Sequence, residues 1–389
     1  MHTRRFPLAS ITAAALLVGG LAGCDVATPT APDETDAALA AQLETDAFSI
    51  YNQNAYLGGD TDPLFQIDLS DIPLLLATTN TFWSQVTQSY VPERMAALVD
   101  QIDEHRPDLV PLEEVFQMAV VDATTGQPVD GADLLASILG EIQARGLPYE
   151  LVQENYLTSV TLPMEIDFTT PTPQIKKVAV ITDRIALLRR TDVEVTASTT
   201  GTYAARIPLT PDITVVRGWI RADIERNGVP YHVFATHLET QGATPIQEAQ
   251  AAELANTVSS GLDGVTILAG DFNSDASSGP GDPQWTHSYQ TLLDAGFTDT
   301  WVQAGGPAHD QGLTCCHDKD LLDQGTAAFN QRIDFIFVKD ARSQAQSGMV
   351  PGAISFDIIG TSDSDRTATH GLWYSDHAGV VAGLRLPKK

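Results

Sequence analysis

Seven polar residues lie at or just past the ends of hydrophobic segments, and an eighth lies inside one. The seven are Asn54, Glu114, His237, Asp271, Asn273, Asp376 and His377, and the eighth is Asp334. Ends of strands are where a rigid scaffold presents functional side chains. An aspartate between Ile333 and Phe335 needs a partner that offsets its desolvation, and a histidine is the natural one.

The residue types in this set indicate one kind of chemistry. Asparagine, glutamate and aspartate offer the oxygen ligands that hard divalent cations prefer, so the sequence predicts Mg²⁺, with Mn²⁺ or Ca²⁺ as alternatives, rather than zinc. The histidines can transfer protons or stabilise charge near neutral pH, and Asn273 can donate to an oxyanion. Together they fit metal-assisted attack of water on a phosphate ester. Singly, an Asp or Asn after a strand is usually a turn residue, so the prediction rests on the whole set.

Strand and helix signals are interleaved from about residue 48 onward, and these elements must position the polar set. Strands are expected at residues 48–51, 108–115, 178–181, 186–189, 215–224, 231–237, 265–269, 329–339 and 379–386. Helices are expected at residues 82–104, 132–145 and 244–256, with Pro92 kinking or delaying the first. Because several strands adjoin one another without a helix, we expect antiparallel pairing in two packed sheets flanked by helices.

Six short motifs, in this order and spacing, resemble the endonuclease/exonuclease/phosphatase superfamily, which has the deoxyribonuclease-I-like fold. They are NQNAYLG (52–58), PDLVPLEEV (107–115), THLE (236–239), GDFN (270–273), RIDFI (332–336) and SDH (375–377). The resemblance implies an α+β fold for residues 47–389, a four-layer α/β/β/α sandwich of two mostly antiparallel sheets. It places the site at one edge of that sandwich.

The resemblance also implies a metal centre. Glu114 would be the principal ligand of a Mg²⁺ ion, with Asn54 and Asp376 nearby. The chain departs from the family at Glu113, where a glutamine is usual, and this glutamate is expected to add negative charge beside the metal.

Catalytic roles follow from the same resemblance. Asp271 would orient or deprotonate the attacking water, and Asn273 would hold a phosphate oxygen. His377 would contact the scissile phosphate, while Asp334 would hydrogen-bond to it and support its positive charge. His237 would assist the leaving group, although we can place no carboxylate partner for it.

The first residues of the chain predict export. Arg4 and Arg5, an apolar stretch at 11–21 and the sequence LAGC at 21–24 are typical of a signal peptide. The last four resemble a bacterial lipobox, which implies cleavage before Cys24 and lipidation of its thiol; a plain signal peptide is the alternative. Residues 24–46 predict a flexible tether. We therefore expect a monomer, anchored by lipid to the cell envelope in the periplasm or on the outer surface.

The charge of the chain limits its partners. The formal net charge is −28, and loss of residues 1–23, which hold two basic and no acidic residues, would leave −30. Lys and Arg supply most non-specific affinity for nucleic acids, so this balance disfavours them. A small or lipid-head-group phosphate ester is the favoured substrate. The alternatives are a secreted deoxyribonuclease-like endonuclease and, in another class, a non-catalytic lipoprotein binding module that keeps the fold.

Three cysteines are too few for a disulfide scaffold. Cys315 and Cys316 look like metal ligands, but adjacent cysteines are poor joint ligands and their spacing to His317 matches no common zinc pattern. We expect two reduced or loop-buried cysteines, with a vicinal disulfide as the alternative.

Overall fold

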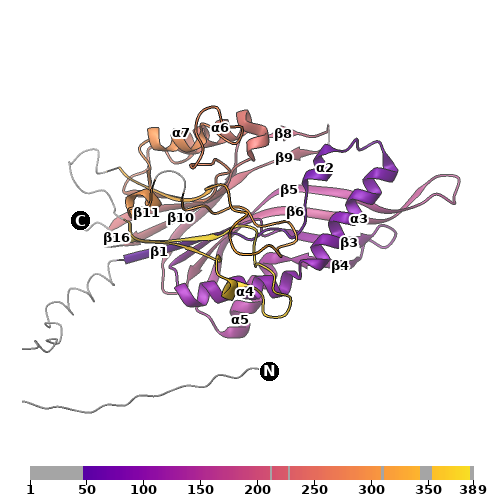
Figure 1. Ribbon diagram of the computed structural model, residues 1–389, viewed down its shortest axis with the longest axis horizontal. Helices are drawn as coiled ribbons and strands as arrows, with labels where there is room; N and C mark the ends of the chain where they lie inside the picture. The colour runs from indigo at the N-terminus through magenta and orange to yellow at the C-terminus, as the bar shows by residue number, and fades with distance from the viewer. Residues whose placement is uncertain (1–46, 211–212, 227, 308–310, 342–352, 386–389) are drawn as a thin grey trace, which may run out of the picture. The chain divides into compact units, whose positions relative to one another are not determined.

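A computed structural model describes residues 47–210, 213–226, 228–307, 311–341 and 353–385 (Figure 1). The predicted signal peptide, the lipidated Cys24 and the tether lie outside the described residues, so the structure does not test them. In the described part of the chain, no helix has the length and apolar character needed to cross a membrane.

The larger sheet has eight strands and is mostly antiparallel. Its order is β15-β16-β1-β2-β6-β3-β4, with β5 paired to β6, and only β1 and β2 are parallel. The strands are β1 (Ala47–Asn54), β2 (Leu109–Glu113), β3 (Gln117–Asp122), β4 (Pro128–Asp133), β5 (Tyr149–Asp167), β6 (Gln174–Arg190), β15 (Ala353–Ile359) and β16 (Gly379–Arg385). Helices α3 (Ile72–Gln88), α4 (Val91–His105) and α5 (Leu134–Arg145) cover its outer face.

The smaller sheet has six strands in the order β13-β14-β12-β11-β10-β7. They are β7 (Val195–Thr202), β10 (Gly218–Arg226), β11 (Val229–His237), β12 (Val265–Asp271), β13 (Thr298–Asp299) and β14 (Asp334–Asp340). Helices α6 (Thr244–Glu253) and α7 (Ser288–Asp294) pack on its outer face. The remaining elements include α2 (Asp62–Gln66), α8 (Thr300–Gln303) and a small hairpin of β8 (Ile207–Pro208) and β9 (Thr214–Val215).

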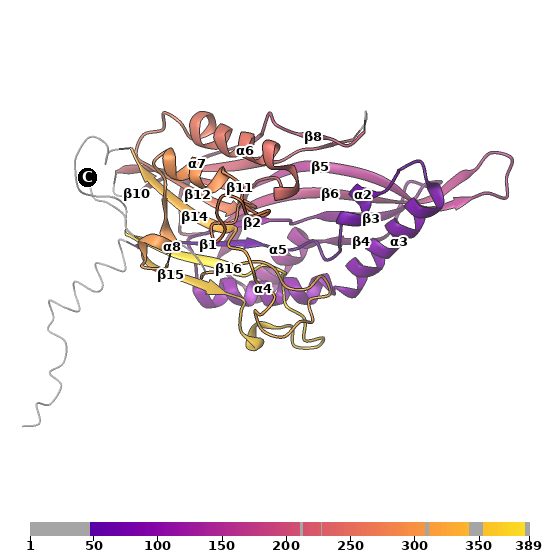
Figure 2. The same cartoon turned by 45° about the horizontal axis from the view of Figure 1, so that its top comes forward.

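Three apolar layers separate four layers of secondary structure. One lies between α3, α4, α5 and the larger sheet, one between the two sheets, and one between the smaller sheet and α6 and α7. Figure 1 shows α6 and α7 at the top and α4 and α5 at the bottom, and Figure 2 shows the strands of both sheets between α6 and α4. The predicted four-layer sandwich is therefore confirmed.

The layer between the sheets ends in polar side chains at one edge. On β12, Ile267 and Ala269 face the intersheet core, and Asp271 is the next residue on that face because side chains alternate along a strand. The same alternation places polar residues on four other strands. They are Asn54 on β1, Glu113 on β2, His237 on β11 and Asp334 on β14.

Two expected elements differ from the structure. The helix expected at 82–104 is two helices, α3 and α4, separated at Ser89 and Tyr90, and Pro92 lies in the first turn of α4, where a missing N–H has no cost. The strands expected at 178–181 and 186–189 are one strand, β6, which pairs along most of its length with the unforeseen strand β5.

Candidate active site

Strand pairing places three of the predicted site residues side by side. His237 at the end of β11 pairs with Asp271 at the end of β12, and Asp271 pairs with Asp334 at the start of β14. On the larger sheet, Asn54 pairs with Glu113 in the same way. The intersheet edge thus gathers residues that are up to 280 positions apart in the chain, from Asn54 to Asp334.

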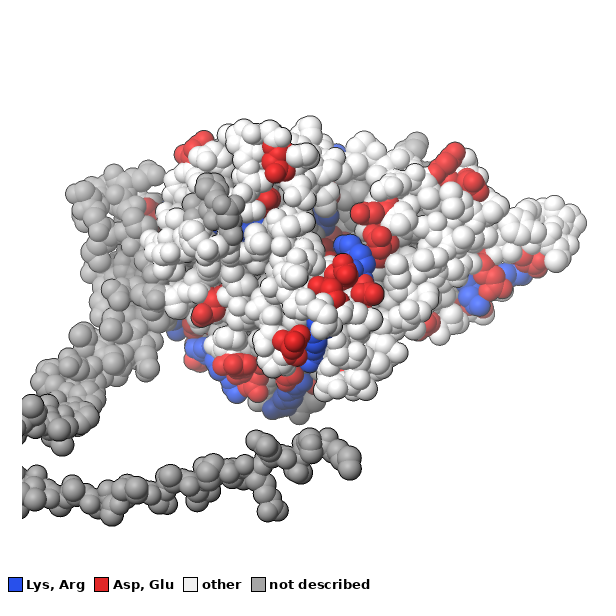
Figure 3. Space-filling view, in the orientation of Figure 1, with Lys and Arg blue, Asp and Glu red and all other residues white. Residues whose placement is uncertain are grey.

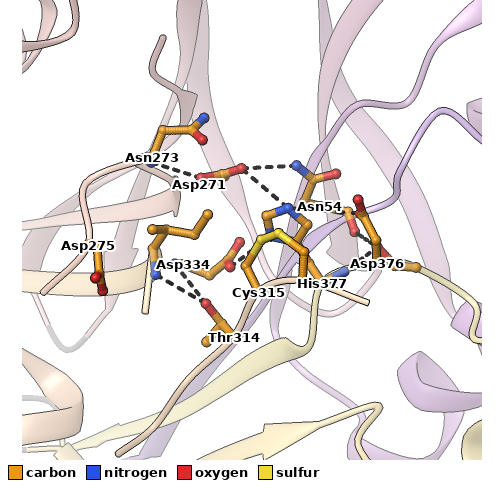
Figure 4. The surroundings of a disulfide bond; sticks show 12 residues. Asn54, Asp271, Asn273, Asp275, Thr314, Cys315, Asp334, Asp376 and His377 are labelled. Carbon is orange, nitrogen blue, oxygen red and sulfur yellow. Dashed lines mark hydrogen bonds and ion pairs between the residues drawn. A yellow bond between two sulfur atoms is a disulfide. The ribbon is translucent and has the colours of Figure 1, made fainter. Parts of the chain in front are cut away.

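His377 reaches this row from the loop before β16. Its Nδ1 lies 2.9 Å from Oδ2 of Asp334, and its Nε2 lies 3.9 Å from Oδ2 of Asp271 (Figure 4). Burial alone would lower the pKa of His377, but the carboxylates of Asp334 and Asp271 outweigh it and raise that pKa well above its ordinary value. The protonated form of His377 is therefore favoured, with Nδ1 donating to Asp334. Its Nε2 faces both Asp271 and Oδ1 of Asp376, which also lies 3.9 Å away.

Asp271 lies at the centre of the site. Its Oδ1 accepts a hydrogen bond from the backbone N–H of Asn273 at 2.9 Å, and its Oδ2 accepts one from Nδ2 of Asn54 at 3.0 Å. Burial and then the neighbouring Asp334 raise the pKa of Asp271 to about 7. A carboxyl group with a pKa near neutrality can accept a proton from water and release it again, as a general base must.

The predicted metal ligands offer suitable oxygen atoms. Glu114 follows β2 with a φ of 55°, a conformation that a residue with a side chain rarely adopts. Its Oε2 accepts from the Leu57 backbone N–H at 3.2 Å, and its Oε1 accepts from Nδ2 of Asn54 at 3.1 Å. Oδ1 of Asp376 is buried without a hydrogen-bond partner among the described residues. A buried carboxylate oxygen without a donor fits a site for a hard cation.

Asn54 is oriented differently from a metal ligand. Its amide nitrogen bridges Glu114 and Asp271, while its amide oxygen accepts from the backbone N–H of Tyr56 at 3.0 Å. The structure thus places Asn54 at the site, and its role as a ligand stays a prediction.

Within the described residues, two further groups have ligand atoms that all lie within 4.8 Å of one another. One is Asp271, Asp334 and His377, and the other is Cys315, Cys316 and His377. The first group offers a second way to hold a cation beside Glu114. The two carboxylates of this group already stabilise the positive charge of His377. A metal ion bound by the same group would have to replace the proton on the histidine.

Glu113 does not add the expected charge. Its side chain is fully buried, and neither carboxylate oxygen has a hydrogen-bond partner among the described residues. Burial raises the pKa of Glu113 well above its ordinary value, and the charges of Asp334 and Asp271 raise it further. These surroundings oppose the ionisation of Glu113, so the structure does not support the expected negative charge beside the metal.

His237 has a partner that sequence reasoning missed. Its Nδ1 lies 3.0 Å from NH1 of Arg217, which a guanidinium can only occupy as a donor, so the ring proton is on Nε2. With the proton on Nε2, that nitrogen points toward Oδ2 of Asp271 at 3.6 Å, and Nδ2 of Asn273, which lies 3.1 Å from it, is a neighbour and not its hydrogen-bond donor. Burial, Arg217 and His377 all lower the pKa of His237 well below its ordinary value. The neutral form of His237 is therefore favoured. Its partner at Nδ1 is Arg217, in place of the carboxylate that we could not find in the sequence.

Arg217 is itself held by two buried carboxylates. It lies 3.3 Å from Oε1 of Glu239 and 3.2 Å from Oδ2 of Asp183. Two hydrogen bonds fix Asn273. Nε2 of Gln247 donates to the backbone carbonyl of Asn273 at 2.7 Å, and Nδ2 of Asn273 donates to the carbonyl of Leu238 at 3.1 Å.

A disulfide joins Cys315 and Cys316, so the expectation of reduced cysteines is wrong and the alternative holds. Cys315 forms a β-bridge with His377, and the carbonyl of Thr314 accepts from the Ala378 backbone N–H at 2.8 Å. The hydroxyl of Thr314 also accepts from the backbone N–H of Asp334 at 3.2 Å. The segment of Thr314, Cys315 and Cys316 therefore contacts the backbone of both His377 and Asp334 (Figure 4).

The site opens into a cleft of about 770 Å³. Six of the eight predicted residues line it, and Asn54 and Asp334 lie buried behind it. Its lining has six acidic residues against two Lys or Arg residues, with the protonated form of His377 as a third positive group. They are Asp60, Asp62, Glu114, Glu239, Asp271 and Asp376 against Arg217 and Lys319. Figure 3 shows acidic side chains gathered beside a basic one near the middle of this face.

Comparisons with known proteins agree with this fold. A profile described as Endonuclease/Exonuclease/phosphatase family matches residues 77–377. The structure is similar to an endonuclease/exonuclease/phosphatase family protein from Leptotrichia buccalis C-1013-b, with a TM-score of 0.50 and 16% identity over 87% of this chain and 99% of that chain. No curated protein matches the chain in sequence.

Two other solved structures are similar at slightly lower scores. One is the endonuclease/exonuclease/phosphatase from Beutenbergia cavernae DSM 12333, with a TM-score of 0.48 and 19% identity over 88% of this chain and 72% of that chain. The other is humanized D. rerio TDP2 with 14 mutations, with a TM-score of 0.49 and 16% identity over 87% of this chain and 99% of that chain.

Proposed function

Because the chain belongs to the endonuclease/exonuclease/phosphatase family, we propose that it is a Mg²⁺-dependent hydrolase of phosphate esters. The observation that carries the proposal is the row of His237, Asp271 and Asp334 in paired register, with His377 held 2.9 Å from Asp334. This row combines a carboxylate of near-neutral pKa with two imidazole N–H donors at the floor of one cleft.

Each side chain of the site has a separate role in the proposed hydrolysis. Glu114 and Asp376, with Asn54, would hold the divalent cation, which supplies positive charge to the phosphate when bound. Asp271 accepts the proton of the attacking water. His377 stays protonated through Asp334 and donates from Nε2 to a phosphate oxygen, where negative charge grows in the transition state.

His237 donates rather than transfers a proton in this proposal. Its Nε2–H faces the same space as Asp271, and Arg217 keeps it neutral. A neutral imidazole can stabilise negative charge on a phosphate or leaving-group oxygen by hydrogen bonding. Asn273 adds its amide group beside it.

The acidic cleft favours small substrates over long polyanions. Six carboxylates outnumber Arg217, Lys319 and the protonated His377, so the cleft attracts a divalent cation but repels the phosphates that flank a scissile bond in DNA. A small or lipid-head-group phosphate ester carries no such flanking charge. A deoxyribonuclease-like endonuclease is the alternative, and a non-catalytic binding module is the alternative of another class.

We also propose that the protein is an exported lipoprotein, anchored through Cys24 and acting as a monomer at the cell envelope. The sequence LAGC at 21–24 and the tether composition of residues 24–46 support this part of the proposal.

A substrate panel tests the function. The purified protein should hydrolyse bis-p-nitrophenyl phosphate with Mg²⁺, lose that activity in a chelator and regain it when Mg²⁺ is restored. Sphingomyelin, inositol phosphates and plasmid DNA should be compared under the same conditions. Fastest cleavage of DNA with a steep salt dependence would favour the endonuclease, and no hydrolysis of any substrate would favour the binding module.

A further inference from the structure

We propose that an apolar pocket beside Glu114 binds the organic group of the phosphate ester, and that this group is a compact apolar group of about the size of a phenyl ring. The inference rests on the proposed function, because it concerns the substrate of the same site. It names a feature that distinguishes this substrate from nucleotides and inositol phosphates.

The pocket is built by three parts of the chain. Its floor is formed by strands β5 and β6 with Phe116, and its walls come from the segment around α2 and from the β8–β9 hairpin. The main apolar contributors are Leu64, Phe65, Phe116, Val160, Leu162 and Leu209. Phe65 is 51% exposed and Leu209 is 37% exposed, so an apolar group bound between them would remove costly surface from water.

The pocket continues from the catalytic cleft. Both are lined by Glu114, Arg217, Leu57, Phe65 and Leu209. A phosphate held near Glu114 is therefore adjacent to the pocket mouth. A group bonded to that phosphate can enter the pocket without leaving the site, so the occupant is the substrate itself.

Most of the pocket lining is apolar, and part of its polar lining is engaged elsewhere. The hydroxyl of Thr158 donates to the carbonyl of Val216 at 3.1 Å and accepts from its N–H at 2.8 Å. Oδ2 of Asp183 is paired with Arg217, whereas Oδ1 of Asp183 is buried without a hydrogen-bond partner among the described residues. Most hydroxyl groups of a sugar or an inositol ring would find no partner against the apolar lining, which disfavours those groups.

The volume limits the size of the group. The pocket holds about 130 Å³, and a cavity of about 150 Å³ lined by Leu, Ile and Phe accommodates benzene. A ring-sized group matches this volume, whereas a whole acyl chain would extend beyond the pocket. Burying such a group contributes as much as burying a large apolar side chain, which corresponds to at least about a tenfold gain in affinity.

Two phosphonates that differ only in this group test the inference. Benzylphosphonate and methylphosphonate carry the same charged head, and both should compete with bis-p-nitrophenyl phosphate. We expect the wild-type protein to bind benzylphosphonate at least about tenfold more tightly, by inhibition constants and by calorimetry, with a negative heat-capacity change for that ligand.

Variants locate the effect. Val160→Trp fills the pocket and should abolish the preference for the benzyl group while leaving the affinity for methylphosphonate unchanged. Phe65→Ala removes one wall from an exposed position and should reduce the preference several-fold. Its matched control is Phe168→Ala, because Phe168 is 60% exposed and lies outside the pocket.

The outcomes separate the inference from the proposed function. Equal affinity for the two phosphonates, or a preference that survives Val160→Trp and Phe65→Ala, would overturn the inference even if bis-p-nitrophenyl phosphate is hydrolysed. Failure to hydrolyse any phosphate ester would overturn the function, while the calorimetric preference for benzylphosphonate would still report on the pocket.

Discussion

The ring of His237 is held from behind by an arginine, and this contact decides what the histidine can do. A carboxylate at Nδ1 would favour the imidazolium form, whereas the guanidinium of Arg217 donates to Nδ1 and opposes protonation. His237 therefore offers one N–H at Nε2 and no extra proton. In the proposed hydrolysis, the leaving group would therefore take its proton from a donor other than His237.

Replacement of Arg217 by lysine separates charge from geometry. Arg217→Lys keeps a cation for Glu239 and Asp183 but loses the planar donor at Nδ1 of His237. We expect kcat to fall by about tenfold, with stability changed by no more than about 1 kcal/mol, because the buried carboxylates keep a counter-charge. Steady-state kinetics and urea denaturation measure both, and an unchanged kcat would show that Nδ1 needs no donor.

Asp334 sets the pH range of the site through two neighbours. Its charge raises the pKa of Asp271, which must be ionised to act as a base, and the pKa of His377, which must be protonated to donate. In Asp334→Asn both pKa values fall. Activity then rises at a lower pH, as Asp271 ionises, and is lost at a lower pH, as His377 deprotonates.

The expected result is a pH–rate profile of kcat/KM whose two limbs both move toward acid pH in Asp334→Asn. Its control is Asp320→Asn, an exposed aspartate of the segment that precedes β14. A variant that only lowers the rate, with both limbs in place, would mean that Asp334 acts by packing and not by charge.

At the scale of the elements, the register between β11 and β12 brings His237 and Asp271 together. Gly270 pairs with Thr236 one position before them, and a Cβ at Gly270 would lie 1.9 Å from the Thr236 carbonyl oxygen. That contact leaves no room for a side chain, since backbone on both strands would have to move. The glycine of the GDFN motif is therefore a packing requirement.

Gly270→Ala should separate the two strands and displace Asp271. Overpacking of this kind costs about 1–3 kcal/mol, and a displacement of about 1 Å at a reacting group can cost about 100-fold in rate. The matched control is Gly279→Ala, because a Cβ at Gly279 meets open space. Denaturation midpoints and kcat should fall for the first variant only; equal behaviour of the two would contradict the register argument.

The sequence predicts the strand ends well because each polar residue continues an apolar alternation, as Asp271 follows Ile267 and Ala269. It does not predict the uninterrupted strand β6, because Asp183 and Arg184 interrupt its apolar pattern. Both are buried by ion pairs to distant residues. Asp183 pairs with Arg217, and Arg184 pairs with Asp133 and Glu154. Such pairs exist only after folding, and no local pattern shows them.

The contact between Arg217 and His237 could have been predicted from the sequence. The Asn-Gly dipeptide at residues 227–228 is typical of a hairpin turn. Counting outward from Arg226 paired with Val229 leads to Gly218 paired with His237, which places Arg217 next to the histidine. The disulfide had no comparable signal, because two adjacent cysteines are compatible with either redox state.

The whole molecule is strongly acidic, with a formal charge of −28, and its catalytic cleft shares that character. The carboxylates of this cleft repel an anionic phosphate unless a bound divalent cation offsets their charge. The charge distribution thus supports the proposed metal dependence, as the ligand types do. The same distribution favours small phosphate esters over DNA.

Anchoring is a property of the whole chain and can be tested apart from catalysis. Cys24→Ser removes the thiol that a lipid would modify, so the protein should move from the membrane fraction to the soluble fraction while its kcat stays unchanged. Metabolic labelling with a fatty acid and cell fractionation measure this. Retention of label or of membrane association in Cys24→Ser would contradict the anchor.

Glu114 and its neighbours are proposed to form a metal-dependent hydrolytic site. The most direct measurement compares kcat for bis-p-nitrophenyl phosphate with Mg²⁺ in Glu114→Ala and in Glu104→Ala, an exposed glutamate of α4 away from the cleft. The site described here predicts a loss of at least about 100-fold for Glu114→Ala and no change for Glu104→Ala. Equal activity of the two variants would contradict it.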